Sequence, residues 1–322
     1  MTEHEPRTHT PGPADHPAPT HRGVHARLMQ LAEVHDNGFR PERTLRVRVE
    51  FIRQLRRRRT QLTVLVLLVL PVIIALAFKV SSDTGSPGAT PQSGSGRPGA
   101  PALVNVATTG ATNFTLFTEF ASAGFLLVVI VALFCGDTVA SEASWSSLRY
   151  LLAIPVPRPR LLRQKLIVAL SLSFAANLLL PAWAYLVGGV FFGWAPFLSP
   201  LGGTFTTGAA LQRLLIVVCY VSMQSLLVAA LAFLLSVLTD APLGAVGGAT
   251  MLVVVSNILD SITALDPYRR FLPTHFQYSW LDALGHTIVW DDMMRGTGLV
   301  LVYSAVFFAL AWWRFQEKDI LS

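Results

Sequence analysis

The run QLTVLVLLVLPVIIALAF, residues 61–78, contains no charged residue and decides the class of this fold. Five more apolar runs follow, and the first of them carries a single acid, Glu119; they cover residues 114–134, 166–192, 214–238, 242–259 and 296–313. A helix rises about 1.5 Å per residue and a bilayer core is about 30 Å thick, so each run can cross a membrane once. The runs lack the alternating polarity of barrel strands. The sequence therefore predicts an all-α, polytopic membrane protein with six transmembrane helices.

The composition supports this class. The chain has 322 residues, of which 52% are hydrophobic and 14% charged, and its mean hydropathy is +0.51. Soluble domains are about one-quarter charged, so no large soluble domain is expected. The net charge is +6, but the arginines lie beside the apolar runs and do not cover a folded face, so no nucleic-acid partner is expected.

Orientation follows from the basic residues that flank the runs. Arginines and lysines concentrate before the first run and between the second and third runs, which places both regions in the cytoplasm. The segments 81–113 and 260–295 hold few basic residues or an excess of acids, and should face outward. Six spans then put both termini of a multi-pass cell-membrane protein in the cytoplasm.

Two parts of the chain precede or make up the membrane domain. Residues 1–40 are poor in apolar groups and predict a disordered or weakly structured cytoplasmic tail, and residues 41–322 form the six-span domain. From residue 41 the pattern predicts a basic amphipathic helix that lies in the membrane surface. Its apolar stripe is Leu45, Val49, Ile52 and Leu55, and its basic face includes Arg46, Arg53, Arg56 and Arg57. A simple positive-inside anchor explains the same arginines.

Glu119 is the one acid inside an apolar run. An ionised group deep in lipid costs several kcal/mol, so this side chain should face water, a partner helix or a translocation pathway. Packing between helices and lining of a pathway both stay open for it.

The stretch between the second and third runs reads GDTVASEASWSSLRYLLAIPVPRPRLLRQK, residues 136–165. Residues 138–153 can form a short amphipathic helix, with Glu142 near its start and Arg149 near its end, as the helix dipole favours. Leu148, Leu151 and Leu152 cluster on one side of this helix. Pro155 then stops it, and Arg158 and Lys165 lead into the third run.

These residues resemble the permease subunits of type-2 ABC transporters, which are mostly exporters. The family pattern has an acid, a Gly-Thr-Leu step, a Leu-Leu pair, a proline with a basic residue, and a lysine that opens the next span. Here the corresponding residues are Glu142, Ser146, Ser147, Leu148, Leu151, Leu152, Pro155, Arg158 and Lys165, with serines at the usual Gly and Thr. The segments FLPTHFQYSW, residues 271–280, and RFQEKDILS, residues 314–322, are also similar to the family. The resemblance covers residues 45–322.

The resemblance implies a division of labour. This chain would form half of a membrane pathway, and a second copy, in a homodimer, would form the other half. A separate ATPase subunit would use ATP and Mg and would dock on the helix at residues 138–153, the coupling helix, whose contacts would come from the residues at 142–158 together with Lys165. The arginine-rich surface helix would resemble the family's connecting helix.

Other motifs are absent from the sequence. The only lysines are Lys79, Lys165 and Lys318, and none follows a glycine-rich phosphate-binding loop, so the chain is not expected to hydrolyse ATP or to bind a cofactor or metal. An ion-gradient transporter or channel is the first alternative, and would need ionisable groups or broken helices near the midplane. A membrane enzyme is the second, but Glu119, His275 and His286 do not make a catalytic set. The substrate is not indicated, although apolar spans suit an amphipathic or lipid-like cargo.

Overall fold

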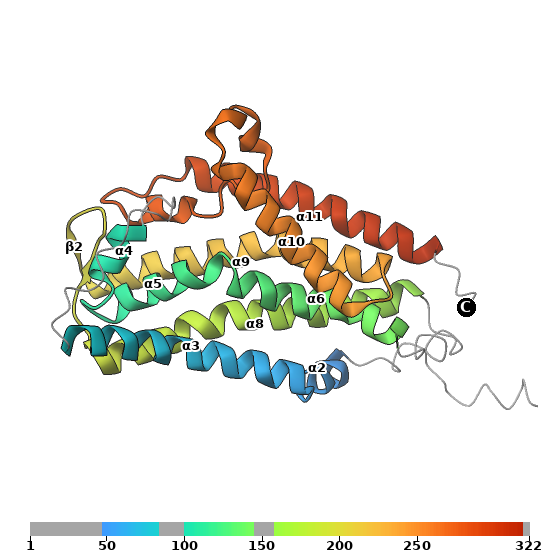
Figure 1. Ribbon diagram of the computed structural model, residues 1–322, viewed down its shortest axis with the longest axis horizontal. Coiled ribbons are helices and arrows are strands. Elements are labelled where there is room, and N and C mark those ends of the chain that lie inside the picture. The colour runs from blue at the N-terminus through green and yellow to red at the C-terminus, as the bar shows by residue number, and fades with distance from the viewer. Residues whose placement is uncertain (1–46, 84–99, 145–157, 318–322) are drawn as a thin grey trace, which may run out of the picture. The chain divides into compact units, whose positions relative to one another are not determined.

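The computed structural model describes residues 47–83, 100–144 and 158–317, except the side chains of residues 82, 83, 100, 101, 142–144, 158 and 159. The predicted tail, Arg46 and the C-terminal residues 318–322 lie outside the described residues. The described chain is mostly helical, which confirms the all-α class (Figure 1). Its elements are α2 Val47–Leu55, α3 Arg58–Asp83, α4 Ala100–Val106, α5 Ala111–Ala123, α6 Leu126–Ser144, α8 Arg158–Phe192, β1 Phe197–Leu198, β2 Thr204–Phe205, α9 Thr207–Leu238, α10 Pro242–Ser261, η3 Thr263–Leu265, η4 Tyr268–Phe271, η5 Ser279–Leu284 and α11 Asp291–Glu317.

Five of the helices are long and apolar enough to cross a membrane: α3, α8, α9, α10 and α11. They contain the predicted runs 61–78, 166–192, 214–238, 242–259 and 296–313. The described chain is thus that of a membrane protein with transmembrane helices. Pro71 and Pro181 lie inside α3 and α8 and interrupt neither helix.

The second predicted span, residues 114–134, is not one helix. It divides into α5 and α6, which are bent by 57° relative to each other at Gly124 and Phe125. The Phe125 amide reaches the Ser122 carbonyl only at 3.4 Å, so the regular ladder of hydrogen bonds lapses there. The bend gives the apolar run two axes where the sequence predicts one.

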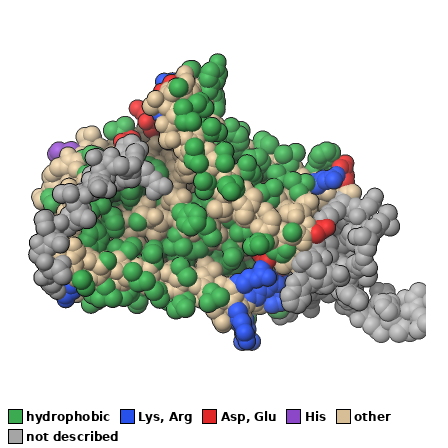
Figure 2. Space-filling model, in the orientation of Figure 1, with side chains coloured by type: hydrophobic (Ala, Val, Ile, Leu, Met, Phe, Trp, Pro, Cys, Tyr) green, Lys and Arg blue, Asp and Glu red, His purple; other side chains and the backbone are tan. Residues whose placement is uncertain are grey.

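Helix α9 is the centre of the packing. It contacts α6, α8, α10 and α11, and 56% of its most apolar 18 residues are buried, against 17% for α3 at the periphery. The main apolar cluster joins α5, α8 and α9 with η5 and includes Phe120, Leu180 and Trp280. The exposed sides of the long helices are hydrophobic, as a lipid environment requires (Figure 2).

The two ends of this bundle differ in composition. One, named here the arginine end, holds the α2–α3 junction and the adjoining ends of α6 and α8 (Figure 1). The opposite end, named here the cap end, holds the β1–β2 hairpin and residues 262–290 between α10 and α11, the α10–α11 connection. The hairpin turn contains Gly202 and Gly203 with φ of 101° and 91°, a region that side-chain-bearing residues rarely adopt.

Candidate functional site

The α2–α3 junction is a short, well-defined break in the helix. Helix α2 ends at Leu55, and α3 begins at Arg58. The Thr60 hydroxyl donates to the Gln54 carbonyl at 2.7 Å, and the same carbonyl accepts from the Arg57 amide at 3.2 Å, so this acceptor at the end of α2 is satisfied across the break. Thr60 is 4% exposed, so the junction is packed against the bundle.

Asp137 of α6 joins this junction to the second span. Its carboxylate accepts hydrogen bonds from Arg57, at 3.3 Å, and from Arg59. The Asp137 side chain is only 10% exposed, whereas the Arg57 and Arg59 side chains are 30% and 47% exposed. The pairs connect residues about 80 positions apart in sequence and fix α6 to the start of α3.

Lys165 lies in the same region, at the arginine end of α8. It is 5% exposed and, with Arg57, Arg59 and Asp137, lines a cavity of ≈ 20 Å³. Four elements, α2, α3, α6 and α8, therefore meet around one small polar volume. The basic side chains near it form a distinct patch on an otherwise hydrophobic flank (Figure 2).

The structure describes only part of the predicted ATPase-coupling set. Residues 138–144 are helical and continue α6 without a break. Glu142 and Arg158 lie on helical backbone at the ends of α6 and α8, but their side chains are outside the described set. The rest of the predicted set falls outside the described residues: Ser147, Leu148, Arg149, Leu151, Leu152 and Pro155.

Helix α2 occupies the described part of the stretch predicted to form the basic amphipathic helix. Phe51 and Gln54 are partly buried toward the bundle, while Val49, Ile52 and Leu55 are exposed. Arg53 is paired with Glu50 one turn earlier, at 2.8 Å, and Arg56 is exposed.

Glu119 occupies the half of the broken span that lies toward the cap end. It is 1% exposed, and neither carboxylate oxygen has a hydrogen-bond partner among the described residues. The side chain therefore faces protein and not lipid. It lies one turn before the end of α5 at Ala123.

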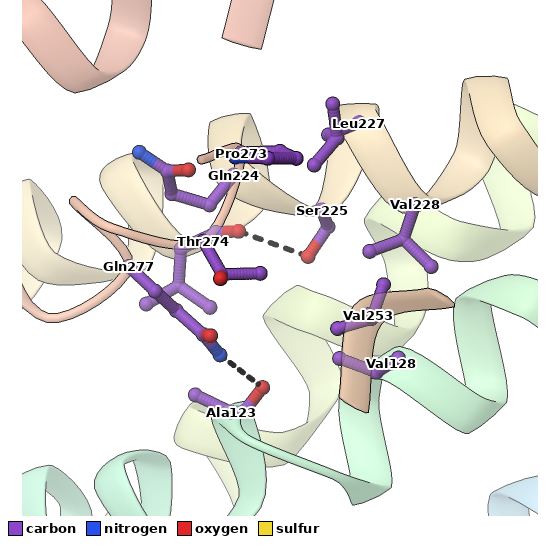
Figure 3. Close-up of a pocket in the computed structure, with 11 residues that line it drawn as sticks. Ala123, Val128, Gln224, Ser225, Leu227, Val228, Val253, Pro273, Thr274 and Gln277 are labelled. Atoms are coloured by element: carbon purple, nitrogen blue, oxygen red, sulfur yellow. Dashed lines mark hydrogen bonds between the residues drawn. The ribbon is translucent and has the colours of Figure 1, made fainter. Parts of the chain in front are cut away.

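The bend after Ala123 is closed by the α10–α11 connection. The Gln277 side-chain amide donates to the Ala123 carbonyl at 2.9 Å (Figure 3). Gln277, Thr274 and Ser225 face a cavity of ≈ 30 Å³ whose other walls include Val128 and Val253 (Figure 3). The volume is that of a water molecule or two, too small for a substrate.

A buried arginine of α9 also holds the α10–α11 connection. Arg213 is 7% exposed and donates to the carbonyls of Ala283, at 2.5 Å, and Gly285, at 2.7 Å. It also donates to the His286 carbonyl at 3.2 Å, and its guanidinium lies 4.1 Å from the centre of the Phe205 ring. One buried cation thus satisfies three main-chain acceptors and stacks on the hairpin.

Tyr220 fixes the connection nearer the middle of α9. Its hydroxyl donates to the Phe276 carbonyl at 2.6 Å. Gly296 of α11 allows this approach, because an added Cβ would lie 2.5 Å from the Phe276 Cβ and 2.6 Å from the Tyr220 hydroxyl. The segment at residues 271–280, which resembles the permease family in sequence, therefore packs between α9 and α11.

The sequence matches a known protein family. A family model described as a protein of unknown function, DUF2705, matches residues 102–321. The chain belongs to the DUF2705 family. The DUF2705 match covers α5, α6 and α8–α11 and leaves α2 and α3 outside it. A search of curated proteins finds no match.

Sequence reasoning missed three residues that organise this DUF2705 chain: Asp137, Arg213 and Gln277. Asp137 and Arg213 stand next to apolar runs, and a polar residue in that setting signals a buried partner, whereas Gln277 lies in the α10–α11 connection and carries no such signal. Their partners lie about 70 to 154 positions away, which no local pattern specifies. Among the described residues, no group of three His, Cys, Asp or Glu side chains could hold a metal ion.

Proposed function

We propose that this chain is the membrane-spanning permease subunit of an ATP-driven exporter and works with a separate ATPase subunit. In this proposal the bent pair α5–α6 counts as one span, which gives six spans in the cell membrane. The arginine end and both termini face the cytoplasm, in keeping with the basic flanks. Two copies of the chain would enclose one pathway, since closed symmetric dimers are the commonest assemblies.

One observation carries the proposal: α6 is a single helix of 19 residues from the bend to Ser144. Its arginine end leads directly into the stretch predicted to bind the ATPase, and its other end is the bend at Gly124. A helix of this length spans about 28 Å. A displacement imposed at residues 142–158 would therefore reach the bend along one rigid element, and ATP would shift the equilibrium between two arrangements of the spans.

The test is reconstitution of the full chain with a separate ABC-type ATPase subunit. Glu142→Arg should leave insertion and ATP hydrolysis intact and lower the export of fluorescent lipids and amphipathic dyes per ATP, because the ATPase contact loses its charge register. Glu317→Arg, an exposed acid at the end of α11, is the matched control and should change nothing. Unchanged export by folded Glu142→Arg, or a cysteine at Leu148 that never crosslinks to the ATPase, would reject the proposal.

A specific observation favours one alternative, an ion-gradient transporter. Broken spans and buried ionisable groups mark ion sites in such transporters, and here Glu119 lies one turn before a break. The same vesicles separate the two functions. Cargo movement with a proton or sodium gradient and no ATP, abolished by Glu119→Gln, would support the alternative, whereas movement that needs ATP and survives Glu119→Gln would support the exporter.

A further inference from the structure

The four consecutive arginines at residues 56–59 do not have equivalent surroundings. Arg57 and Arg59 pair with Asp137, whose side chain is 10% exposed. Arg56 and Arg58 are exposed, and neither makes an ion pair with another residue in the part of the chain that the structure describes. Arg59 is itself 47% exposed, so the two pairs differ in their bonding to Asp137 and not in burial alone.

The setting of α2 indicates what the second pair faces. Val49, Ile52 and Leu55 are 63%, 40% and 41% exposed, and α2 has no buried residue. Phe51 and Gln54, by contrast, turn toward the bundle. An exposed apolar face beside a transmembrane helix lies at the hydrocarbon boundary, so the arginines that follow it are at the level of the lipid phosphates.

We propose that this arginine run is divided between two partners. Arg57 and Arg59 hold the junction to the second span through Asp137, and Arg56 and Arg58 bind the phosphates of anionic lipids. A guanidinium matches a phosphate with two parallel hydrogen bonds, and its charge complements the anionic membrane surface. Asp137 makes the division, because it occupies the arginines nearest to it. This inference rests on the membrane position of the chain and is independent of the ATPase.

The experiment uses the full chain in nanodiscs of phosphatidylcholine alone or with phosphatidylglycerol. The wild-type chain should unfold at a higher temperature when phosphatidylglycerol is present. Arg56→Gln/Arg58→Gln should abolish this increment and leave the midpoint in phosphatidylcholine unchanged. Arg57→Gln/Arg59→Gln should lower the midpoint in both lipids and keep the increment. Binding of a fluorescent phosphatidylglycerol in detergent should weaken about fivefold for each arginine lost from the pair Arg56 and Arg58.

A control separates a site from general attraction between charges. Arg270→Gln/Arg295→Gln removes the same charge from exposed positions at the cap end, and nanodiscs carry phosphatidylglycerol in both leaflets. This variant should keep the increment. The proposal is overturned if Arg56→Gln/Arg58→Gln retains the increment, or if the control loses it equally. Asp137→Asn offers a milder test of the first pair where the double arginine variant does not fold, and should lower the midpoint in both lipids alike.

Discussion

The arginine end and the cap end each join segments that are distant in sequence, but they do so with different kinds of bond. At the arginine end, helices distant in sequence are joined by ion pairs between side chains, with Asp137 of α6 facing Arg57 and Arg59. At the cap end, side chains of α9 and the α10–α11 connection donate to main-chain carbonyls, as Arg213, Tyr220 and Gln277 do. The first kind of bond depends on charge, and the second depends on the position of the backbone.

The difference has a mechanical consequence. Ion pairs tolerate changes in distance and angle, since the attraction of two charges falls slowly with separation. Hydrogen bonds to carbonyls weaken steeply when the geometry changes, and a buried carbonyl that loses its donor is costly. We therefore expect the arginine end to accommodate movement of α6 and the cap end to be held rigidly against α5 and α9.

The largest expected effect breaks the cap end. Arg213→Met keeps much of the side-chain volume but leaves the carbonyls of Ala283, Gly285 and His286 without their donor. The free energy of unfolding should fall by about 3 kcal/mol, because buried acceptors lose their partners. The measurement is thermal unfolding in detergent, combined with proteolysis of the α10–α11 connection, which should become sensitive.

Arg213→Lys and Arg295→Met complete that test. The lysine keeps the charge but cannot reach three acceptors with a planar fork, so it should recover only part of the loss. The Arg295 side chain is 72% exposed, and its substitution should change the free energy of unfolding by less than about 0.5 kcal/mol. Full recovery by lysine would show that charge, and not donor geometry, holds the cap end.

The next effect concerns the arginine end. Asp137→Arg should destabilise the junction by about 2 kcal/mol, because the largely buried position then holds a cation beside Arg57 and Arg59, although the exposure of both arginines screens part of the repulsion. Arg59→Asp in the same chain should restore part of the loss, since the charges are exchanged and an ion pair has lenient geometry. Thermal unfolding at low and high salt measures both variants, and the restoration should shrink as salt rises.

A second ion pair serves as the control for this charge exchange. Asp292 and Arg295 form an exposed ion pair at 3.5 Å on α11, and Asp292→Asn should cost almost nothing. If the double variant at Asp137 and Arg59 were no more stable than Asp137→Arg, the junction would depend on the shape of its side chains, and the contrast between the two ends would fail.

Much of the fold could be predicted from charge-free runs, because burial in lipid leaves a helix as the only way to pair the backbone. The bend in the second run could not. Gly124 lies at the bend, but Gly188 and Gly189 lie inside α8 and interrupt nothing. The bend depends on what packs against it, and the Gln277 amide that meets the freed Ala123 carbonyl comes from 154 positions away.

The candidate site was predictable to a similar extent. The pattern of apolar and basic residues predicted the surface helix, and Val47–Leu55 is a helix. Four consecutive arginines give no sequence signal that Arg57 turns toward the bundle and Arg56 turns away from it. That division needs the break after Leu55 and the presence of Asp137, two features that belong to different helices.

The smallest expected effect is a dependence of the unfolding midpoint on pH, set by carboxylates at the cap end. At the cap end, partial desolvation and the nearby Asp292 carboxylate raise the pKa of Asp282 above its usual 3.8. Folding is therefore penalised once this group ionises, so Asp282→Asn should raise the unfolding midpoint at neutral pH, and the gain should vanish as the pH falls below about 4.

Asp266→Asn is the control, and its stability should change with pH in the opposite direction. The hydrogen bond from Arg269 lowers the pKa of Asp266, so its ionised form stabilises the fold at neutral pH and that stabilisation is lost in acid. The midpoint of Asp266→Asn should lie below that of the unsubstituted chain at pH 7 and meet it at low pH. Parallel pH profiles for the two variants would mean that the carboxylates of the cap end act through the net charge of the chain and not through their separate surroundings.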